Sequence, residues 1–349
     1  MMRGANATRS ANALGMSLLA IALLALPAIM PALKLNISLG TSLLLFGLAA
    51  ASVNIMVGYT GLMAFGNAAF FGVGAYGSAL FSHYIMPDNL LLAAVVGAIA
   101  GLVSALILGP FLIRRRGIYF ALLTVAFGQV YYFIAYRWSD VTGGEDGFSI
   151  TRPALFGAHS VRLEGPSYYY LVLVTFAVVM VLLWYLVRSP FGLTLRAISQ
   201  NEIRVRYLAI NSDRIILRAL GVSGLIAGIA GSLYSMSINF AYPLMLDWHQ
   251  SGDFVMMVIL GGAGTLFGPL LGAVIYTLAA NVLSSWTQAW QIIIGAMFVL
   301  CVLFFPKGIL GIGAMLRSAE VEDAEDPLDI SDTASRPHEP AVAMESERS

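Results

Sequence analysis

Residues 196–214 read RAISQNEIRVRYLAINSDR, and the stretch after them, 215–238, is dominated by apolar side chains, serine and glycine. The chain changes here from a segment that needs water to one long enough to cross a bilayer, since a transmembrane helix takes about 20 apolar residues. The same alternation runs through the sequence. Of its 349 residues 59% are hydrophobic and only 11% are charged, with a mean hydropathy of +0.82. This composition predicts an integral membrane protein.

Eight segments have the length and composition of a spanning helix: 14–33, 37–57, 61–83, 91–113, 118–136, 168–187, 215–238 and 287–305. The stretch 253–283 is long for one crossing and contains GGAGTLFGP, so it is either one kinked helix or two short ones. We therefore predict an all-α polytopic protein with nine or ten transmembrane helices, all within residues 14–312.

The arginines predict the orientation, because cytoplasmic loops carry an excess of positive charge. They cluster in the break at 114–116 and in the segment 188–214. Both breaks then lie in the cytoplasm, and so does the N-terminal arm, 1–13. The loop 137–167 and the segment 239–252 are external. The tail 313–349 is rich in acids and poor in large apolar residues, which predicts a disordered tail. Two crossings in 253–283, the reading we favour, would place that tail in the cytoplasm.

Small residues recur at helical spacing in four segments. The series are Gly97, Gly101, Ala105 and Gly109; Ala64, Ala68 and Gly72; Gly264, Gly268 and Gly272; and Gly221, Gly224, Gly228 and Gly231. In lipid, small residues let helix backbones approach closely and so supply the association. The stripes predict a compact helical bundle.

Several kinds of chemistry have no support in the sequence. The spans carry no acid near their middle, with Asp247 and Asp253 at an edge, and no phosphate-binding or HExxH motif is present. Cys301 is the only cysteine and the four histidines are scattered, so we expect no metal site, no cofactor and no enzymatic activity. An ion-coupled secondary transporter stays open, because broken helices can bind sodium through backbone carbonyls.

Neutral polar residues inside the spans are candidates for a translocation path: Asn54, Asn67, Thr124 and Gln129. Each could equally bond a neighbouring helix. Asn67 is the strongest candidate because it lies in GYTGLMAFGNAAFFGVGAYGSALF, whose glycines favour an irregular backbone, which is tolerated at membrane depth only inside protein or beside a cavity.

The polar segment 196–214 has the pattern of a short helix. Ser199 followed by Glu202 is a capping box that predicts a helix start near Gln200, and Glu202 and Arg206 are spaced for an ion pair. Wound as a helix, Ile203, Tyr207 and Ile210 share one face, with Val205 and Leu208 roughly opposite. Two opposed apolar strips suit a helix between two protein surfaces, namely its own bundle and a cytosolic partner. An ordinary juxtamembrane loop is the alternative.

SPFGLTLRAISQNEIRVRYLAINSDRIILRALGVSGLIAGIAGSLY (189–234) resembles the coupling segment and following helix of branched-chain amino acid ABC importer permeases of the LivM type. In chain order GYTGLMAFGNAAFFGVGAYGSAL (58–80), RRRGIYFALLTVAFGQVYYFIAYRW (114–138), VTGGEDGF (141–148), VILGGAGTLFGPLLGAVI (258–275) and LFFPKGILGI (303–312) resemble the same family. The resemblance covers nearly everything from about 37 to 312.

The resemblance implies an ABC importer permease fold in the inner membrane. It implies a second, LivH-like permease, two ATP-binding cassette subunits and a solute-binding protein as partners, and no nucleic acid. Contacts to the ATPase are then expected from Arg196, Ser199, Asn201, Glu202 and Asn211. Two positions depart from the family: it usually has Gly at the place of Ala209 and commonly His at the place of Asn67.

Overall fold

The computed structural model describes Pro27 and residues 36–86, 89–150, 154–155, 165–304 and 308. Its elements are α2 (Ile37–Asn54), the π-helix η1 (Ile55–Tyr59), α3 (Asn67–Tyr84), α4 (Leu90–Leu112), α5 (Ile118–Arg137), α6 (Ser139–Thr142), η2 (Gly144–Asp146), β1 (Phe148–Ser149), α7 (Pro166–Arg188), α8 (Pro190–Tyr207), α9 (Ser212–Ile238), β2 (Phe240–Ala241), η3 (Pro243–Leu246), α10 (Trp248–Gly261), α11 (Gly268–Trp286) and α12 (Trp290–Phe304). The fold is all-α apart from one two-stranded pair, as predicted. The predicted span 14–33, except Pro27, the arm 1–13 and the tail 313–349 lie outside the described residues.

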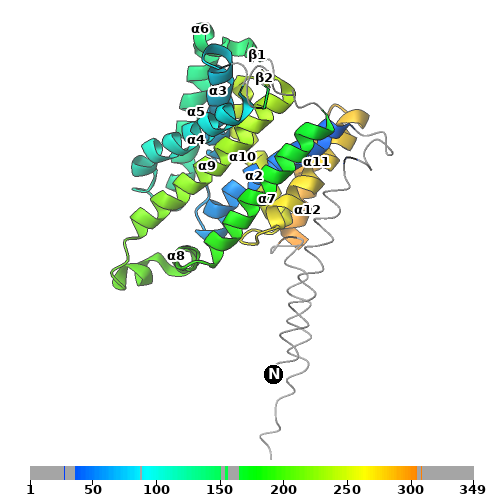
Figure 1. Cartoon of the computed structure of the whole chain (residues 1–349). Coiled ribbons are helices and arrows are strands. Elements are labelled where there is room, and N and C mark those ends of the chain that lie inside the picture. Colours follow the sequence, from blue (N-terminus) through cyan, green and yellow to red (C-terminus); the bar gives the residue numbers. More distant parts are fainter. Residues whose placement is uncertain are drawn as a thin grey trace, which may run out of the picture.

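Helix α9 is the centre of the bundle. Figure 1 shows α3, α4 and α5 on one side of it, and α2, α7, α11 and α12 on the other. Six of the described helices are long and apolar enough to cross a membrane: α2 with η1, α4, α5, α7, α9 and α11. The segment α8 lies outside the bundle at one end, which we call the arginine-rich end. The short elements α6, β1 and β2 lie at the opposite end (Figure 1).

The stripe predicted in α9 contacts both α4, through the stripe predicted there, and α3. In α3 the contact is made at Gly74, which is not in the predicted series, whereas Gly72 of that series lies against Leu246. A Cβ atom added to Gly74 in α3 would lie 2.5 Å from the Cα of Gly228 in α9. One added to Gly101 in α4 would lie 2.4 Å from the carbonyl oxygen of Gly224. These distances leave no room for a side chain, so the three backbones are in direct contact. The packing role of the Gly97 and Gly221 stripes is confirmed.

The stretch 253–283 forms two helices, α10 and α11, joined by a turn at 262–267. Gly262 and Gly264 in this turn have positive φ values of 115° and 78°, a conformation that favours glycine. The two helices pack closely, since a Cβ atom on Gly261 would lie 1.7 Å from the carbonyl oxygen of Gly268. The glycines of GGAGTLFGP therefore serve both the reversal of the chain and the contact of the two helices.

The predicted span 61–83 begins later than expected. Residues 61–66 are not helical, and α3 begins at Asn67. Gly61 has a positive φ of 71°, which interrupts the helix after η1. The irregular stretch is enclosed by protein: a Cβ atom on Gly66 would lie 2.2 Å from the carbonyl oxygen of Thr124. The glycine-rich sequence thus forms an irregular backbone, as proposed for it.

The two segments predicted to be external meet at the same end of the bundle. β1, from the loop 137–167, pairs antiparallel with β2, from the segment 239–252, with Phe148 opposite Ala241. This agreement supports the assignment of both segments to one side of the membrane.

The packing of α9 predicts a specific effect of one added methyl group. In Gly228→Ala the new methyl would lie 2.7 Å from the carbonyl oxygen of Gly97, and such overpacking costs about 1–3 kcal/mol. We expect a lower midpoint of thermal unfolding in detergent. Gly295→Ala in α12 is the control, because nothing lies within 4 Å of its added Cβ. Equal midpoints for the two variants would contradict the assignment.

Candidate functional site

Segment α8 consists of two helical pieces that meet at Asn201. Asn201 has extended backbone angles (φ −161°, ψ 96°), and its Oδ1 accepts the N–H of Arg204 at 3.0 Å. Asn201 is therefore the N-cap of the second piece, and the predicted capping box at Ser199 is wrong by two residues. The preceding piece, which starts at Pro190, continues through Ser199, whose Oγ would lie 2.9 Å from a Cβ atom on Gly61.

Four charged side chains connect the second piece of α8 to the bundle. Arg116, between α4 and α5, holds Glu202 in a bidentate pair, with Nε–Oε2 at 2.9 Å and Nη2–Oε1 at 3.0 Å. The same Nη2 donates to Asp213 in the first turn of α9 at 2.5 Å. Arg206 donates to Glu202 at 2.8 Å, the ion pair that the sequence predicted, and lies 3.3 Å from Asp213. We call these residues the ion cluster.

The ion cluster changes the acidity of its central carboxylate. Partial burial by itself would raise the pKa of Glu202, but the hydrogen bonds from Arg116 and Arg206 outweigh it and hold the pKa below its ordinary value of 4.5. Glu202 therefore stays ionised at neutral pH. Its bond to Arg116 replaces the bond to the Ser199 backbone that a capping box would require.

One apolar face of α8 is turned away from the bundle. Val205 is buried, whereas Ile203, Tyr207 and Leu208 are 64%, 85% and 73% exposed. The predicted division into a buried and an exposed strip is confirmed for Val205, Ile203 and Tyr207. It is wrong for Leu208, which follows the last helical residue and turns outward with Tyr207. It is also wrong for Ile210, which was predicted on the face of Ile203 and Tyr207 but is partly buried and packs against the core. We call Ile203, Tyr207 and Leu208 the exposed apolar face.

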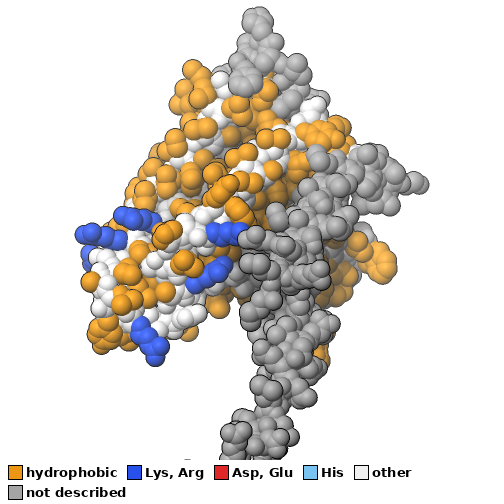
Figure 2. Space-filling model, turned by 60° about the horizontal axis from the view of Figure 1, so that its bottom comes forward, with side chains coloured by type: hydrophobic (Ala, Val, Ile, Leu, Met, Phe, Trp, Pro, Cys, Tyr) orange, Lys and Arg blue, Asp and Glu red, His pale blue; other side chains and the backbone are white. Residues whose placement is uncertain are grey.

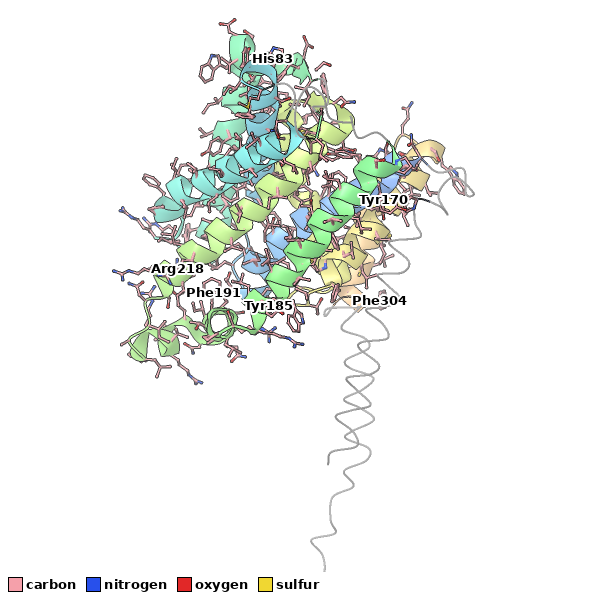
Figure 3. The ribbon with its side chains drawn as sticks, viewed as in Figure 1. His83, Tyr170, Tyr185, Phe191, Arg218 and Phe304 are labelled. Carbon is pink, nitrogen blue, oxygen red and sulfur yellow. The ribbon has the colours of Figure 1, made fainter. Side chains whose placement is uncertain are left out.

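Arginine side chains surround this face. Figure 2 shows them on the surface that includes the arginine-rich end. The exposed ones are Arg114, Arg115, Arg188, Arg196, Arg204, Arg206, Arg214 and Arg218. Figure 3 shows Arg218 projecting from α9 at this end. Of the predicted contact residues, Arg196 packs 5.4 Å from the centroid of the Tyr59 ring.

The end of α8 explains the departure at position 209. Ala209 has a φ of 59°, the left-handed conformation that glycine adopts without cost. The tight turn is thus kept although the residue is Ala. Asn211 has a φ of −79°, and its Oδ1 accepts the N–H of Arg214 at 3.1 Å, so it is the N-cap of α9.

Three of the four predicted path residues bond neighbouring elements. Asn54 donates to the carbonyl of Thr265 at 2.8 Å and accepts the N–H of Gly264 at 2.9 Å, which fixes the α10–α11 turn. Asn67 donates to Ser223 of α9 at 3.0 Å. The Oγ of Thr124 accepts the N–H of Phe65 at 3.1 Å. All three are buried, and a role in a path stays a prediction for them.

The fourth, Gln129, leads to a polar cluster that the sequence did not reveal. Its amide Nε2 donates to Oδ2 of Asp247 at 3.4 Å. Oδ1 of Asp247 accepts the backbone N–H of His249 at 2.8 Å and lies 2.5 Å from Nδ1 of the same ring. Gln129 is the twelfth of the 20 residues of α5. At 1.5 Å per residue it lies about 12 Å from Arg137 at the far end of that helix.

The assignment of all of 239–252 to an external loop is therefore wrong for its second half. After β2 the chain turns into the bundle, where Leu246 lies against α3; a Cβ atom on Gly72 would be 2.4 Å from Leu246 Cγ. Asp247 is accordingly not at an edge but beside the middle of α5. The sequence did contain a signal, since a stretch with Asp and His but without Lys or Arg lies between two apolar helices.

An all-helical bundle with long apolar helices, irregular backbone inside it and an arginine-rich end has the architecture of a multi-pass membrane transport protein. A family model for the permease component of the branched-chain amino acid transport system matches residues 36–302. The chain belongs to this family.

Individual relatives agree with the family. The chain is 30% identical to the high-affinity branched-chain amino acid transport permease LivM of Salmonella typhimurium and 28% identical to that of Escherichia coli, over 79% of this chain and 70% of each relative. It is 23% identical to a probable LivM of Methanocaldococcus jannaschii over 77% of this chain and 92% of the relative. No solved structure is significantly similar to the chain.

The ion cluster predicts a pH-dependent stability. Because the fold lowers the pKa of Glu202, its contribution is present in full above pH 4.5 and is lost as the pH falls through the lowered pKa. Arg116→Gln should destabilise the protein by about 2 kcal/mol near neutral pH and make the loss on acidification shallower. Thermal unfolding in detergent from about pH 7 to about pH 3 measures both effects. Arg115→Gln is the control, and an identical pH profile in both variants would contradict the prediction.

The left-handed residue at the end of α8 predicts a stabilising substitution. Ala209→Gly should raise the free energy of unfolding by about 1 kcal/mol, because it removes the contact between Cβ and the carbonyl oxygen. Ala197→Gly, at an exposed helical position of the same segment, should lower it by about 1 kcal/mol. Chemical denaturation of both variants tests the opposite signs. A loss of stability in Ala209→Gly would show that the turn does not have this backbone conformation.

Proposed function

We propose that the chain is the permease subunit of an ATP-binding cassette importer for branched-chain or related amino acids in the inner membrane. It forms half of the translocation path, and a second permease forms the other half. Two ATP-binding subunits dock at the arginine-rich end, which is cytoplasmic, and a solute-binding protein delivers the amino acid at the opposite end. The chain itself hydrolyses no ATP. The membership in the permease family supports this role.

The exposed apolar face of α8 carries the proposal. A helix that covers its own bundle needs one apolar strip, which Val205 supplies. Ile203, Tyr207 and Leu208 form a second strip that points away from the bundle, at an end lined by arginines. Apolar side chains rimmed by charge are typical of a protein interface, with an aromatic residue near its centre. A soluble, acidic surface of an ATP-binding subunit fits this description.

The ion cluster connects the docked segment mechanically to the membrane helices. Arg116 bonds both Glu202 of α8 and Asp213 of α9, and it lies between α4 and α5. A displacement of α8 therefore acts on three membrane helices at once. The side chains of Arg116 and Glu202 are only 26% and 22% exposed, which makes their bidentate bond stronger than a surface ion pair. In this role Glu202 is a positioning residue, and Arg196, Ser199, Asn201 and Asn211 contact the ATPase or shape the segment that does.

Tyr207 provides the test of docking. Tyr207→Ala should weaken binding of the ATP-binding subunits by about thirtyfold, as expected for an aromatic residue worth about 2 kcal/mol at the centre of an interface. Tyr84→Ala is the control. Tyr84 is 63% exposed and ends α3, at the end of the bundle opposite α8 (Figure 3). The measurements are co-purification with the ATP-binding subunits of the importer and nucleotide-driven uptake of leucine by the assembly. Binding that is equal in both variants would place the docking surface elsewhere.

Transport assays with the purified chain distinguish the proposed function from that of an ion-coupled secondary transporter. Proteoliposomes that hold only this chain should accumulate no leucine under a proton or sodium gradient. Uptake should require the ATP-binding subunits and ATP. Uphill transport by the chain alone would overturn the proposed function.

A further inference from the structure

The cluster of Gln129, Asp247 and His249 lies at membrane depth but is not enclosed by the chain. The side chain of His249 is 74% exposed, whereas that of Asp247 is 11% exposed. Trp248 between them is 45% exposed. The buried polar residues Asn54, Asn67 and Thr124 show the contrast, because each is satisfied inside the bundle. An ionisable group exposed at this depth needs a separate explanation.

Contact of this surface with lipid would be energetically unfavourable. A charged or ionisable side chain at the bilayer centre costs several kcal/mol and usually faces a bundle interior or water. The backbone from β2 to the start of α10 is also not α-helical, and such backbone is tolerated at membrane depth only inside protein or beside a water-filled cavity. Both observations indicate that His249 faces an aqueous path.

The hydrogen bonds define which atom of His249 is available. An ionised carboxylate only accepts hydrogen bonds, so Nδ1, 2.5 Å from Oδ1 of Asp247, carries a proton. In the neutral imidazole Nε2 is then an acceptor, at the opposite edge of the ring. Asp247 also accepts the amide of Gln129, which fixes the carboxylate from the side of α5. The cluster then presents Nε2 as an acceptor, with the Asp247 carboxylate on the other edge of the ring.

The surroundings increase the preference for a cation. Residues 243–261 contain no Lys or Arg. Asp253, one helical turn after His249, lies on the same helix and accepts the hydroxyl of Tyr276 at 2.5 Å. The region therefore has carboxylates and hydrogen-bond acceptors without a balancing positive side chain among these residues.

We propose that His249 contacts the solute on its way through the membrane, and that its Nε2 accepts a hydrogen bond from the ammonium group of the amino acid. Asp247 is the positioning residue that fixes the ring and its tautomer, and Gln129 holds Asp247. This inference rests on the proposed function. It adds which chemical group of the amino acid, the ammonium group, is bound in the translocation path. It also assigns the face formed by α5, η3 and the start of α10 to the translocation path.

Cysteine accessibility tests the path without relying on transport. Cys301 is the only cysteine of this chain, so Cys301→Ser removes its thiols, and labelling is read from this chain after the subunits are separated. In the complete importer, His249→Cys should react with a charged, membrane-impermeant methanethiosulfonate at least about tenfold faster than Val178→Cys, because only a hydrated thiol forms the reactive thiolate. Val178 is the control, since it is 53% exposed near the middle of α7. Equal, slow labelling of both positions would overturn the proposal, whether lipid or a partner subunit covers residue 249.

Transport kinetics test the ammonium contact. His249→Ala should raise the apparent KM for leucine about tenfold, as expected for the loss of one hydrogen bond to a charged group. His249→Gln keeps an acceptor and should restore most of the affinity. His83→Ala is the control, because His83 is exposed at the end of α3 (Figure 3).

The outcomes separate the two proposals. If His249→Ala has the same apparent KM as His83→Ala, the ammonium contact is wrong even where transport depends on ATP. If the wild-type assembly imports no amino acid, the proposed function fails, and the labelling of residue 249 still reports whether that face is hydrated. Labelling together with an unchanged KM also overturns the contact, since it leaves only a hydrated surface.

Discussion

The direct contact between the backbones of α9, α3 and α4 is the constraint on which the rest of the structure depends. Apolar side chains gain little by leaving lipid for a protein interface, so helices in a membrane associate mainly through close packing. Glycines make that packing possible here: Gly74, Gly101, Gly224 and Gly228 bring the three helices together without intervening side chains. Because α8 precedes α9 and β2 follows it, the position of both depends on this contact.

Asn54, Asn67 and Thr124, which are buried in the bundle, each form a hydrogen bond with a neighbouring element. Asn67 donates to Ser223, which in turn donates to the carbonyl of Ser52, so that one chain of hydrogen bonds joins α3, α9 and α2. Leaving such groups unpaired in a low-dielectric interior would cost several kcal/mol. The pair of Asp247 and His249 is bonded internally on one edge only. Under the proposed path, its exposed edge faces water and solute and not lipid.

Much of the fold follows from the sequence, because hydropathy, arginine placement and glycine spacing are local signals. They predicted the spans of α2, α4, α5, α7 and α9 to within a few residues, and the role of the glycine stripes. They also predicted the bond between Glu202 and Arg206. The N-cap at Asn201 was not predicted, because Ser199 and Asn201 are both good caps and only the tertiary bond from Arg116 to Glu202 decides between them.

The depth of Asp247 and His249 could not be read from hydropathy. A window over 239–252 averages the polar residues with Pro and Leu and reports a loop, whereas the depth is set by the contact of Leu246 with Gly72 and of Asp247 with Gln129. Both contacts join residues far apart in the sequence. For the same reason Asn54, Asn67 and Thr124 could be identified as important polar residues, but their partners could not.

Helix α9 connects the ion cluster to the cluster of Gln129, Asp247 and His249. Asp213 in the first turn of α9 bonds Arg116 and lies 3.3 Å from Arg206, while the last turn of α9 leads within two residues to β2, and then through η3 to Asp247. A helix held by backbone contacts on two sides moves as a unit, since interdigitated packing does not deform continuously. Under the proposed function, a push on α8 therefore changes the tilt of α9 and shifts the segment that carries His249 relative to Gln129 on α5. The bond between Gln129 and Asp247, the longest in that cluster at 3.4 Å, is the one that such a shift would break first.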